Sequence, residues 1–287
     1  MGIKHRTYLA ILLFFPLLSG CIAVATLVDK DLSYHKIAKS AKFEKIRLKT
    51  KYFTFTCFYR FIKPGEPVNI YIEGDGNAWI SRSRLSNNPT PRIPLVLKLA
   101  SIDESANVAY LARPGQYSEK SIPKVESAYW SDKRFSEEVI TSMDEAIGEI
   151  VDLAKTDKIN LIGYSGGGAV AVLIAARRND IISLRTIAGN LDIEAVSKYH
   201  NVSPLSGSLN PINFAQNLKD LPQRHFIGSK DTTVPSSVSE NFVKRMGDKD
   251  YSRITVVKDA THSKGWTKHW KEFLGYPVDK ARLPANN

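Results

Sequence analysis

The stretch that most constrains this chain is the segment 163–167, with the sequence Gly-Tyr-Ser-Gly-Gly. A short apolar run at 159–162 precedes it, and an alanine-rich apolar run follows at 169–176. This strand-turn-helix setting is typical of a nucleophile elbow, a sharp turn that exposes a serine to a histidine base. A glycine-rich turn without chemistry is the alternative, and the setting favours Ser165 as a nucleophile. The N–H of Gly166, at the positive end of the following helix, would face a developing oxyanion.

Strand and helix patterns alternate along much of the chain. Repeated βα units of this kind predict an α/β fold, a mostly parallel sheet with helices on both faces. Residues 51–63 and 68–73, joined by a Pro-Gly-Glu-Pro turn, predict a hairpin that leads into the sheet. Residues 189–222 interrupt the alternation and predict an excursion over the active site. The remaining strands are predicted at 107–112, 182–188, 223–231 and 253–262, and helices at 95–100 and 136–155.

Two residues downstream of Ser165 complete a set for nucleophilic catalysis. Asp231 ends a predicted strand within the turn 228–235, and His262 follows a later strand. A carboxylate that orients an imidazole, which in turn takes the serine proton, is the arrangement such chemistry needs. Asp259 lies only three residues before His262 and is the competing acid. We favour Asp231, because its turn carries glycine and proline residues that aim a side chain from a separate strand.

A second oxyanion donor is predicted after the strand 68–73. The sequence there is Glu73-Gly-Asp-Gly, and the backbone N–H of Asp75 or Gly76 would supply the donor. A flexible turn is the alternative for this loop.

The ordered set of elbow serine, strand-end aspartate and late histidine resembles the α/β-hydrolase family, over roughly residues 50–275. Within that family it is similar to uncharacterised hydrolases of bacterial lipoproteins. The resemblance implies an α/β-hydrolase fold and a catalytic set of Ser165, Asp231 and His262. One departure concerns the first oxyanion loop, where many relatives carry His-Gly and this chain has Glu73-Gly74.

The first twenty residues have the pattern of a signal peptide. Basic residues at 4–6 precede an apolar segment at 8–18, which is too short to span a bilayer comfortably. The segment ends in Leu-Ser-Gly-Cys21, which resembles the lipobox of bacterial lipoproteins. That resemblance implies cleavage before Cys21 and attachment of lipid to it. An ordinary secretory signal with a coincidental cysteine is the alternative.

The expected organisation follows from this leader. Residues 1–20 form the signal peptide, the polar and lysine-rich residues 21–50 form the lipid anchor and a tether, and residues 51–287 form the hydrolase domain. Since Ile22, not an aspartate, follows Cys21, resemblance to enterobacterial sorting implies the outer membrane, facing the periplasm. Membrane lipid is thus an expected partner.

Charge and cysteine content narrow the remaining function classes. The formal charge is +11, and without Lys4 and Arg6 it is 38 basic minus 29 acidic side chains, or +9. The lysines are scattered, so we expect no nucleic-acid partner and only weak attraction to anionic lipid. Once Cys21 is lipidated, Cys57 alone cannot form an internal disulfide, and we expect it to be a buried strand residue.

The sequence shows no spacing for a metal site and no convincing nucleotide loop, so we expect no cofactor and no metal. His225 is expected to pack in the core, and His269 to pack on a terminal helix. The function that best fits these features is a membrane-tethered serine hydrolase that cleaves carboxylic esters through an acyl-Ser165 intermediate. Two alternatives remain: an envelope lipoprotein that uses the fold as a binding module, and an amidase or peptidase with the same triad.

Overall fold

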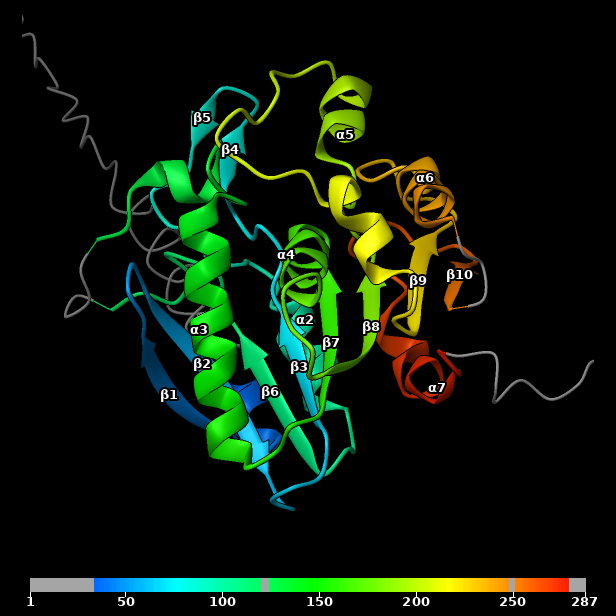
Figure 1. Ribbon diagram of the computed structural model, residues 1–287. Coiled ribbons are helices and arrows are strands. Elements are labelled where there is room, and N and C mark those ends of the chain that lie inside the picture. The colour runs from blue at the N-terminus through cyan, green and yellow to red at the C-terminus, as the bar shows by residue number, and fades with distance from the viewer. Residues whose placement is uncertain (1–33, 120–123, 248–250, 279–287) are drawn as a thin grey trace, which may run out of the picture.

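A computed structural model describes residues 34–119, 124–247 and 251–278 (Figure 1). Its centre is an eight-stranded sheet with the order β1-β2-β6-β3-β7-β8-β9-β10. The strands from β6 to β10 in this order run parallel to one another, while β2 is antiparallel to both of its neighbours. The eight strands are β1 (Glu44–Lys49), β2 (Thr54–Phe61), β3 (Val68–Ile72), β6 (Asn107–Leu111), β7 (Ile159–Tyr164), β8 (Ile181–Ile187), β9 (Gln223–Gly228) and β10 (Ser252–Val257).

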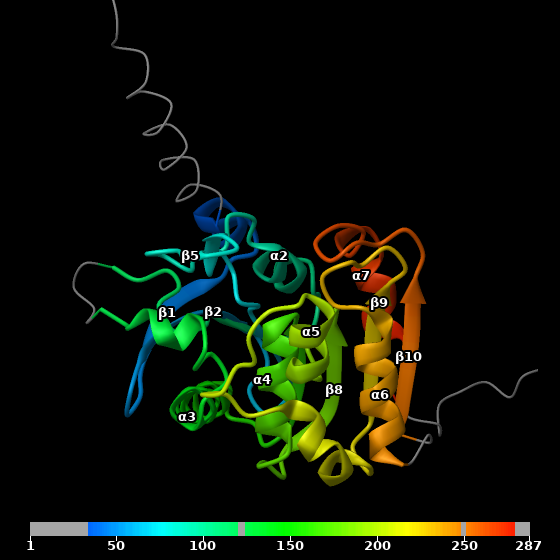
Figure 2. The ribbon, with the colours of Figure 1, turned by 90° about the horizontal axis from the view of Figure 1, so that it is seen from above.

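Helices cover both faces of the sheet (Figure 2). On one face α3, α4 and α6 pack on strand residues such as Ile70 and Leu161, and on the other α2 and α7 pack on Tyr71 and Tyr110. Because both faces are covered, β3 and β6 are buried along their whole length. The helices are α2 (Leu95–Ser101), α3 (Glu137–Ala154), α4 (Gly166–Ala175), α5 (Ile193–Tyr199), α6 (Ser236–Met246) and α7 (Trp270–Gly275), with 3-10 turns at Ser127–Trp130, Pro211–Leu218 (η2) and Thr267–His269. A small separate ribbon pairs β4 (Trp79–Ser81) with β5 (Arg84–Leu85).

The predicted α/β architecture is confirmed, and so are the predicted helices at 95–100 and 136–155. None of the helices in the described part of the chain is long and apolar enough to span a bilayer.

The sequence prediction places the start of the domain at residue 51, but the fold begins earlier in the chain. Residues 44–49 form the edge strand β1, which pairs with β2, and Leu48 is fully buried. Residues 34–40 are helical, and Ala38 is buried against the sheet. The polar composition that suggested a tether reflects an edge strand, where only alternate residues face the core and charges blunt the open edge. Residues 34–50 are therefore part of the fold.

The predicted hairpin of 51–63 with 68–73 is also wrong. β6 lies between the two strands and pairs antiparallel with β2 and parallel with β3. The five residues of β6 are all buried. Their backbone groups therefore need a hydrogen-bonded strand on each side, so β6 lies inside the sheet although it comes after β3 in the sequence. The hairpin that forms joins β1 to β2 one strand earlier, where Thr50 N–H donates to the Phe53 carbonyl at 2.9 Å.

The segment 189–222 has two parts. Its second part, η2, packs against α4 and α6, where Ala215 and Leu218 are buried in the core. Its first part borders the elbow, because Asn190 N–H donates to the Ser165 carbonyl at 2.9 Å. Only the first part therefore lies at the site, while η2 completes the helical layer.

Candidate active site

Ser165 sits between β7 and α4 in a strained backbone conformation, with φ 52° and ψ −120°. Such a conformation persists only where the surroundings hold it. Ser165 N–H donates to the Ile187 carbonyl at 2.9 Å, which ties the turn to β8. A Cβ at Gly163 would lie 2.3 Å from the Gly167 carbonyl oxygen, and one at Gly167 would lie 2.3 Å from the Ile72 oxygen. The two flanking glycines are therefore required for the turn to form.

The structure brings the three predicted residues into one hydrogen-bonded relay, named here the Ser-His-Asp relay (Ser165, His262 and Asp231). His262 Nε2 lies 3.0 Å from Ser165 Oγ, and His262 Nδ1 lies 2.9 Å from Asp231 Oδ2. A carboxylate can only accept, so Nδ1 carries the proton and Nε2 is free to accept the serine hydroxyl proton. This geometry supports proton transfer from Ser165 to His262.

Asp231 is fixed and ionised. Its Oδ1 accepts the backbone N–H groups of Thr233 and Val234 at 2.8 and 3.0 Å. Burial opposes ionisation, but the hydrogen bond and charge of His262 and these two N–H groups outweigh it, so the pKa of Asp231 is lowered. The competing acid, Asp259, forms an exposed ion pair with Lys230 at 2.7 Å. It is thus Asp231 that contacts the imidazole.

Two residues that the sequence prediction missed hold His262 in place. The His262 carbonyl accepts the Trp266 indole N–H at 2.9 Å and the Tyr164 hydroxyl at 3.1 Å. Trp266 is fully buried, so the histidine loop is anchored to the core. Tyr164 directly precedes the nucleophile, and Trp266 lies four residues after His262. Their closeness in sequence to catalytic residues is the one signal by which the sequence could have indicated their role.

The oxyanion loop lies against the start of α4. A Cβ at Gly166 would lie 2.0 Å from Asp75 Oδ1, so a larger residue there would displace the Asp75 carboxylate. Gly76 has φ 65°, and a Cβ on it would lie 2.1 Å from the Pro89 oxygen. The N–H groups of Asp75 and Gly76 donate to no backbone carbonyl among the described residues. Both predicted donors therefore stay available beside the N–H of Gly166.

Glu73, which the sequence analysis noted as the departure at the start of this loop, is a buried acid. Its Oε1 accepts the Gly74 N–H and its Oε2 accepts the Tyr110 hydroxyl, each at 2.9 Å. Burial raises its pKa to about 7, although both hydrogen bonds and Arg113 act in the opposite direction. The Glu73 carboxyl thus braces the loop from within.

The remaining predicted residues lie elsewhere. Cys21 and the signal peptide fall outside the described residues. Cys57 is buried in β2, and burial raises the pKa of its thiol, which disfavours a nucleophilic role. His225 packs in the core between Thr186 and Gln223, where burial lowers its pKa to about 3.

His269 lies with its ring centroid 5.8 Å from that of Phe273 and keeps 43% of its side chain exposed. No three His, Cys, Asp or Glu side chains gather as a metal site within the described ranges.

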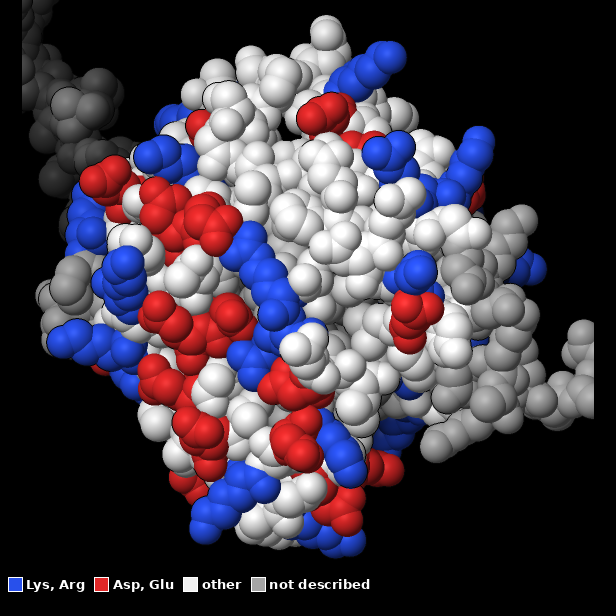
Figure 3. Space-filling model, in the orientation of Figure 1, with Lys and Arg blue, Asp and Glu red and all other residues white. Residues whose placement is uncertain are grey.

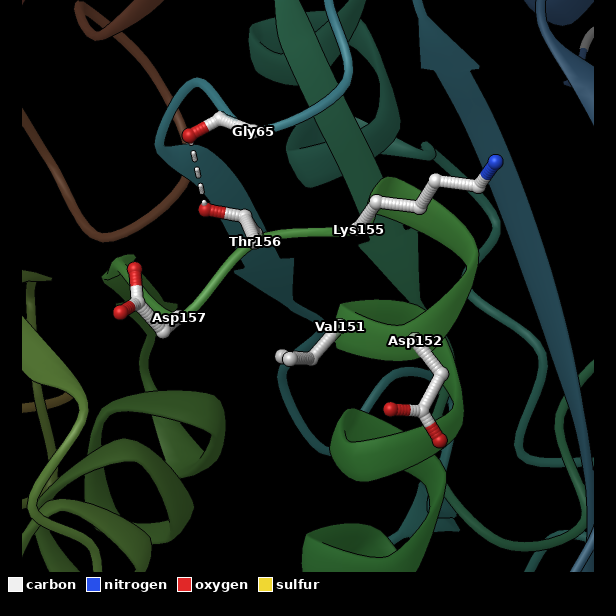
Figure 4. Close-up of a pocket in the computed structure, with 6 residues that line it drawn as sticks. All are labelled: Gly65, Val151, Asp152, Lys155, Thr156 and Asp157. Carbon is white, nitrogen blue, oxygen red and sulfur yellow. Dashed lines mark hydrogen bonds between the residues drawn. The ribbon is translucent and has the colours of Figure 1, made fainter.

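A hollow lies at the amino ends of β3 and β7, whereas Ser165 follows the carboxyl end of β7 (Figure 4). The residues around it come from the turn before β3 and from the end of α3. Thr156 Oγ1 donates a hydrogen bond to the Gly65 carbonyl at 3.5 Å. Its lining consists of Gly65, Val151, Asp152, Lys155, Thr156 and Asp157. It contains none of the relay residues, which follow the carboxyl ends of β7, β9 and β10.

Comparison with known proteins identifies the fold. The chain is similar to the esterase Pf2001 of Pyrococcus furiosus, with a TM-score of 0.58 and 18% identity over 83% of this chain and 92% of that one. It is similar to the Pyrococcus horikoshii acylaminoacyl peptidase, with a TM-score of 0.60 and 16% identity over 84% of this chain and 44% of that one. Est1E of Butyrivibrio proteoclasticus gives a TM-score of 0.56 and 15% identity, over 80% of this chain and 97% of that one. Likeness at these identities shows the α/β-hydrolase fold.

A search of curated proteins gave no match. A family model described as serine hydrolase (FSH1) matches residues 99–265. This region covers more than half of the chain and contains Ser165, Asp231 and His262. The protein therefore belongs to the FSH1 family of serine hydrolases, and its fold is that of the α/β-hydrolases.

Proposed function

We propose that this serine hydrolase cleaves carboxylic esters through an acyl-Ser165 intermediate. The observation that carries the proposal is the unbroken Ser-His-Asp relay, with its hydrogen bonds of 3.0 and 2.9 Å. A protein that used the fold only for binding would have no need of a serine held at φ 52° and aligned with a base. The geometry thus favours catalysis over the binding-module alternative.

The reaction follows from the atoms in place. Ser165 Oγ attacks the carbonyl carbon while His262 Nε2 takes its proton, and the carbonyl electrons move onto the oxygen. The N–H of Gly166 and that of Asp75 or Gly76 stabilise this oxyanion. When the carbonyl reforms, the alcohol leaves with the proton from His262. Water then attacks the acyl group by the same route, which releases the carboxylic acid and restores the Ser165 hydroxyl.

An amide substrate is the second candidate. The observation in its favour is the structural likeness to the acylaminoacyl peptidase of Pyrococcus horikoshii. This chain spans less than half of that protein, so the likeness covers only part of it. Esters remain the first proposal, because the esterases Pf2001 and Est1E are matched over nearly their whole length.

The proposal includes attachment to the cell envelope. We place the protein on the outer membrane, facing the periplasm, with lipid on Cys21 as its anchor. The support is the lipobox-like Leu-Ser-Gly-Cys21 and the Ile22 that follows it. Figure 3 shows acidic side chains gathered over α3 with basic side chains beside them, and a wide area without charged side chains over the middle of this face. The acidic side chains among the basic ones on this face do not favour a nucleic-acid partner.

Labelling with a fluorophosphonate tests the function. We expect the probe to modify Ser165 and to block turnover of p-nitrophenyl butyrate, and Ser165→Ala to lose both labelling and turnover. The matched control is Ser237→Ala, an exposed serine on α6, which should behave as wild type. Undiminished turnover in Ser165→Ala would reject the assignment. A folded wild type without activity on esters or amides would favour the binding module.

A further inference from the structure

Three charged side chains lie together beside the nucleophile elbow. Asp75 Oδ1 occupies the space that a Gly166 side chain would need. Arg134 Nε lies 3.2 Å from Asp75 Oδ2, and Arg113 Nη1 lies 3.6 Å from Asp75 Oδ1. The Arg113 side chain is 4% exposed and that of Arg134 16% exposed. Two guanidinium groups thus share one carboxylate next to the oxyanion position.

This cluster is incompletely satisfied. Among the described residues, Arg113 Nε and Nη1, Arg134 Nε and Asp75 Oδ1 are buried polar atoms without a hydrogen bond of good geometry, although the two arginines lie at ion-pair distance from Asp75. Glu73, the other acid near Arg113, already accepts from Gly74 and Tyr110. Buried N–H groups of a guanidinium are costly when they have no acceptor. When Glu73 is protonated, the single carboxylate of Asp75 faces two guanidiniums, so the cluster then carries a positive charge that an anion can balance.

The position of the arginines relative to Ser165 indicates which part of a substrate they meet. Arg113 follows β6 and Asp75 follows β3, on one side of β7, while Asp231 and His262 follow β9 and β10 on the other side. The alcohol must leave beside His262, which gives it a proton. The acyl chain of a bound ester can therefore extend toward the arginines.

The two guanidiniums are also held in place. Each lies over the ring of Phe135, at 5.3 Å from its centroid, and Arg113 Nη2 donates to the Arg134 carbonyl. Phe135 is fully buried, so this support is rigid. Preorganised planar groups with several donors match the two oxygens of a carboxylate.

We propose that Arg113 and Arg134 bind a carboxylate on the acyl group of the substrate, so that the preferred substrates are monoesters of dicarboxylic acids. This inference rests on the ester hydrolysis proposed above. The free carboxylate pairs with the guanidinium groups, which it meets first at Arg134, the more exposed of the two at 16%, and it orients the ester carbonyl over Ser165. A neutral acyl chain gains no such contact.

Paired substrates test the subsite. We compare kcat/KM for the mono-p-nitrophenyl esters of succinate, glutarate and adipate with those for p-nitrophenyl butyrate, pentanoate and hexanoate. Charge-assisted hydrogen bonds predict a preference of at least about 10-fold for one acidic ester over its neutral counterpart. In Arg134→Gln this ratio should fall by about 10-fold or more. Arg177→Gln, which removes an arginine paired with Glu137 on the surface, should leave the ratio unchanged.

A second measurement uses the unaltered protein. Free glutarate should inhibit p-nitrophenyl acetate turnover at concentrations at least about 10-fold lower than pentanoate does. The proposal is rejected if glutarate and pentanoate inhibit equally and if acidic and neutral esters are turned over equally in wild type and in Arg134→Gln. The arginines would then only hold the loop that contains Asp75 in place. That result still leaves Ser165-dependent turnover of neutral esters, whereas failure of the proposed function abolishes turnover of both series.

Discussion

The substitution Asp231→Asn probes the relay most directly. The Asn side-chain oxygen can still accept the N–H groups of Thr233 and Val234, which hold Asp231 Oδ1 at 2.8 and 3.0 Å. The amide NH₂ then faces His262 Nδ1, where Asp231 Oδ2 lay at 2.9 Å. Since an amide nitrogen can only donate, Nδ1 must become the acceptor, and the imidazole proton moves to Nε2.

This tautomer points a proton at Ser165 Oγ, so His262 cannot take the hydroxyl proton. In the serine protease example the equivalent change lowers kcat about 10⁴-fold. That factor corresponds to about 5 kcal/mol of lost transition-state stabilisation. We expect a loss of the same order here, with little effect on KM, because the substitution touches no substrate group.

The assay is steady-state turnover of p-nitrophenyl butyrate, with circular dichroism to confirm that each variant is folded. The matched control is Asp259→Asn, which breaks only the exposed pair with Lys230 and should keep kcat near wild type. A kcat for Asp231→Asn above about a tenth of wild type would refute the tautomer reasoning. A large loss in Asp259→Asn instead would transfer the role to that acid.

Two further predictions concern groups outside the relay. Glu73 has its pKa raised from 4.5 to about 7, so the folded state holds a proton that the unfolded state has lost between these values, and stability falls as the pH rises through this window. Urea unfolding should therefore show Glu73→Gln gaining about 3 kcal/mol on wild type between pH 5 and pH 8; a constant difference would mean that Glu73 stays ionised. Cys21→Ser should move the protein from the detergent-soluble membrane fraction to the soluble fraction without loss of ester turnover. Recovery of that variant in membranes would rule out anchoring through this residue.

Local patterns alone were sufficient to identify the relay residues and the α/β class. The elbow needs its glycines because Gly163 and Gly167 have no room for a Cβ. Both glycines lie within five consecutive residues, so the motif can be recognised from the sequence. Asp231 likewise accepts N–H groups from residues two and three positions ahead. Structural requirements that involve residues close in sequence can therefore be predicted from a local motif.

Tertiary structure alone decided which distant segments meet. β6 lies between β2 and β3, because a strand that is buried on both faces takes its partners from the packed sheet and not from its neighbours in sequence. The raised pKa of Glu73 comes from desolvation, which no local pattern reports. The encounter of Asp75 with Arg113 and Arg134 joins residues 38 and 59 positions apart. Such pairings depend on the closure of the whole core, so only the folded chain reveals them.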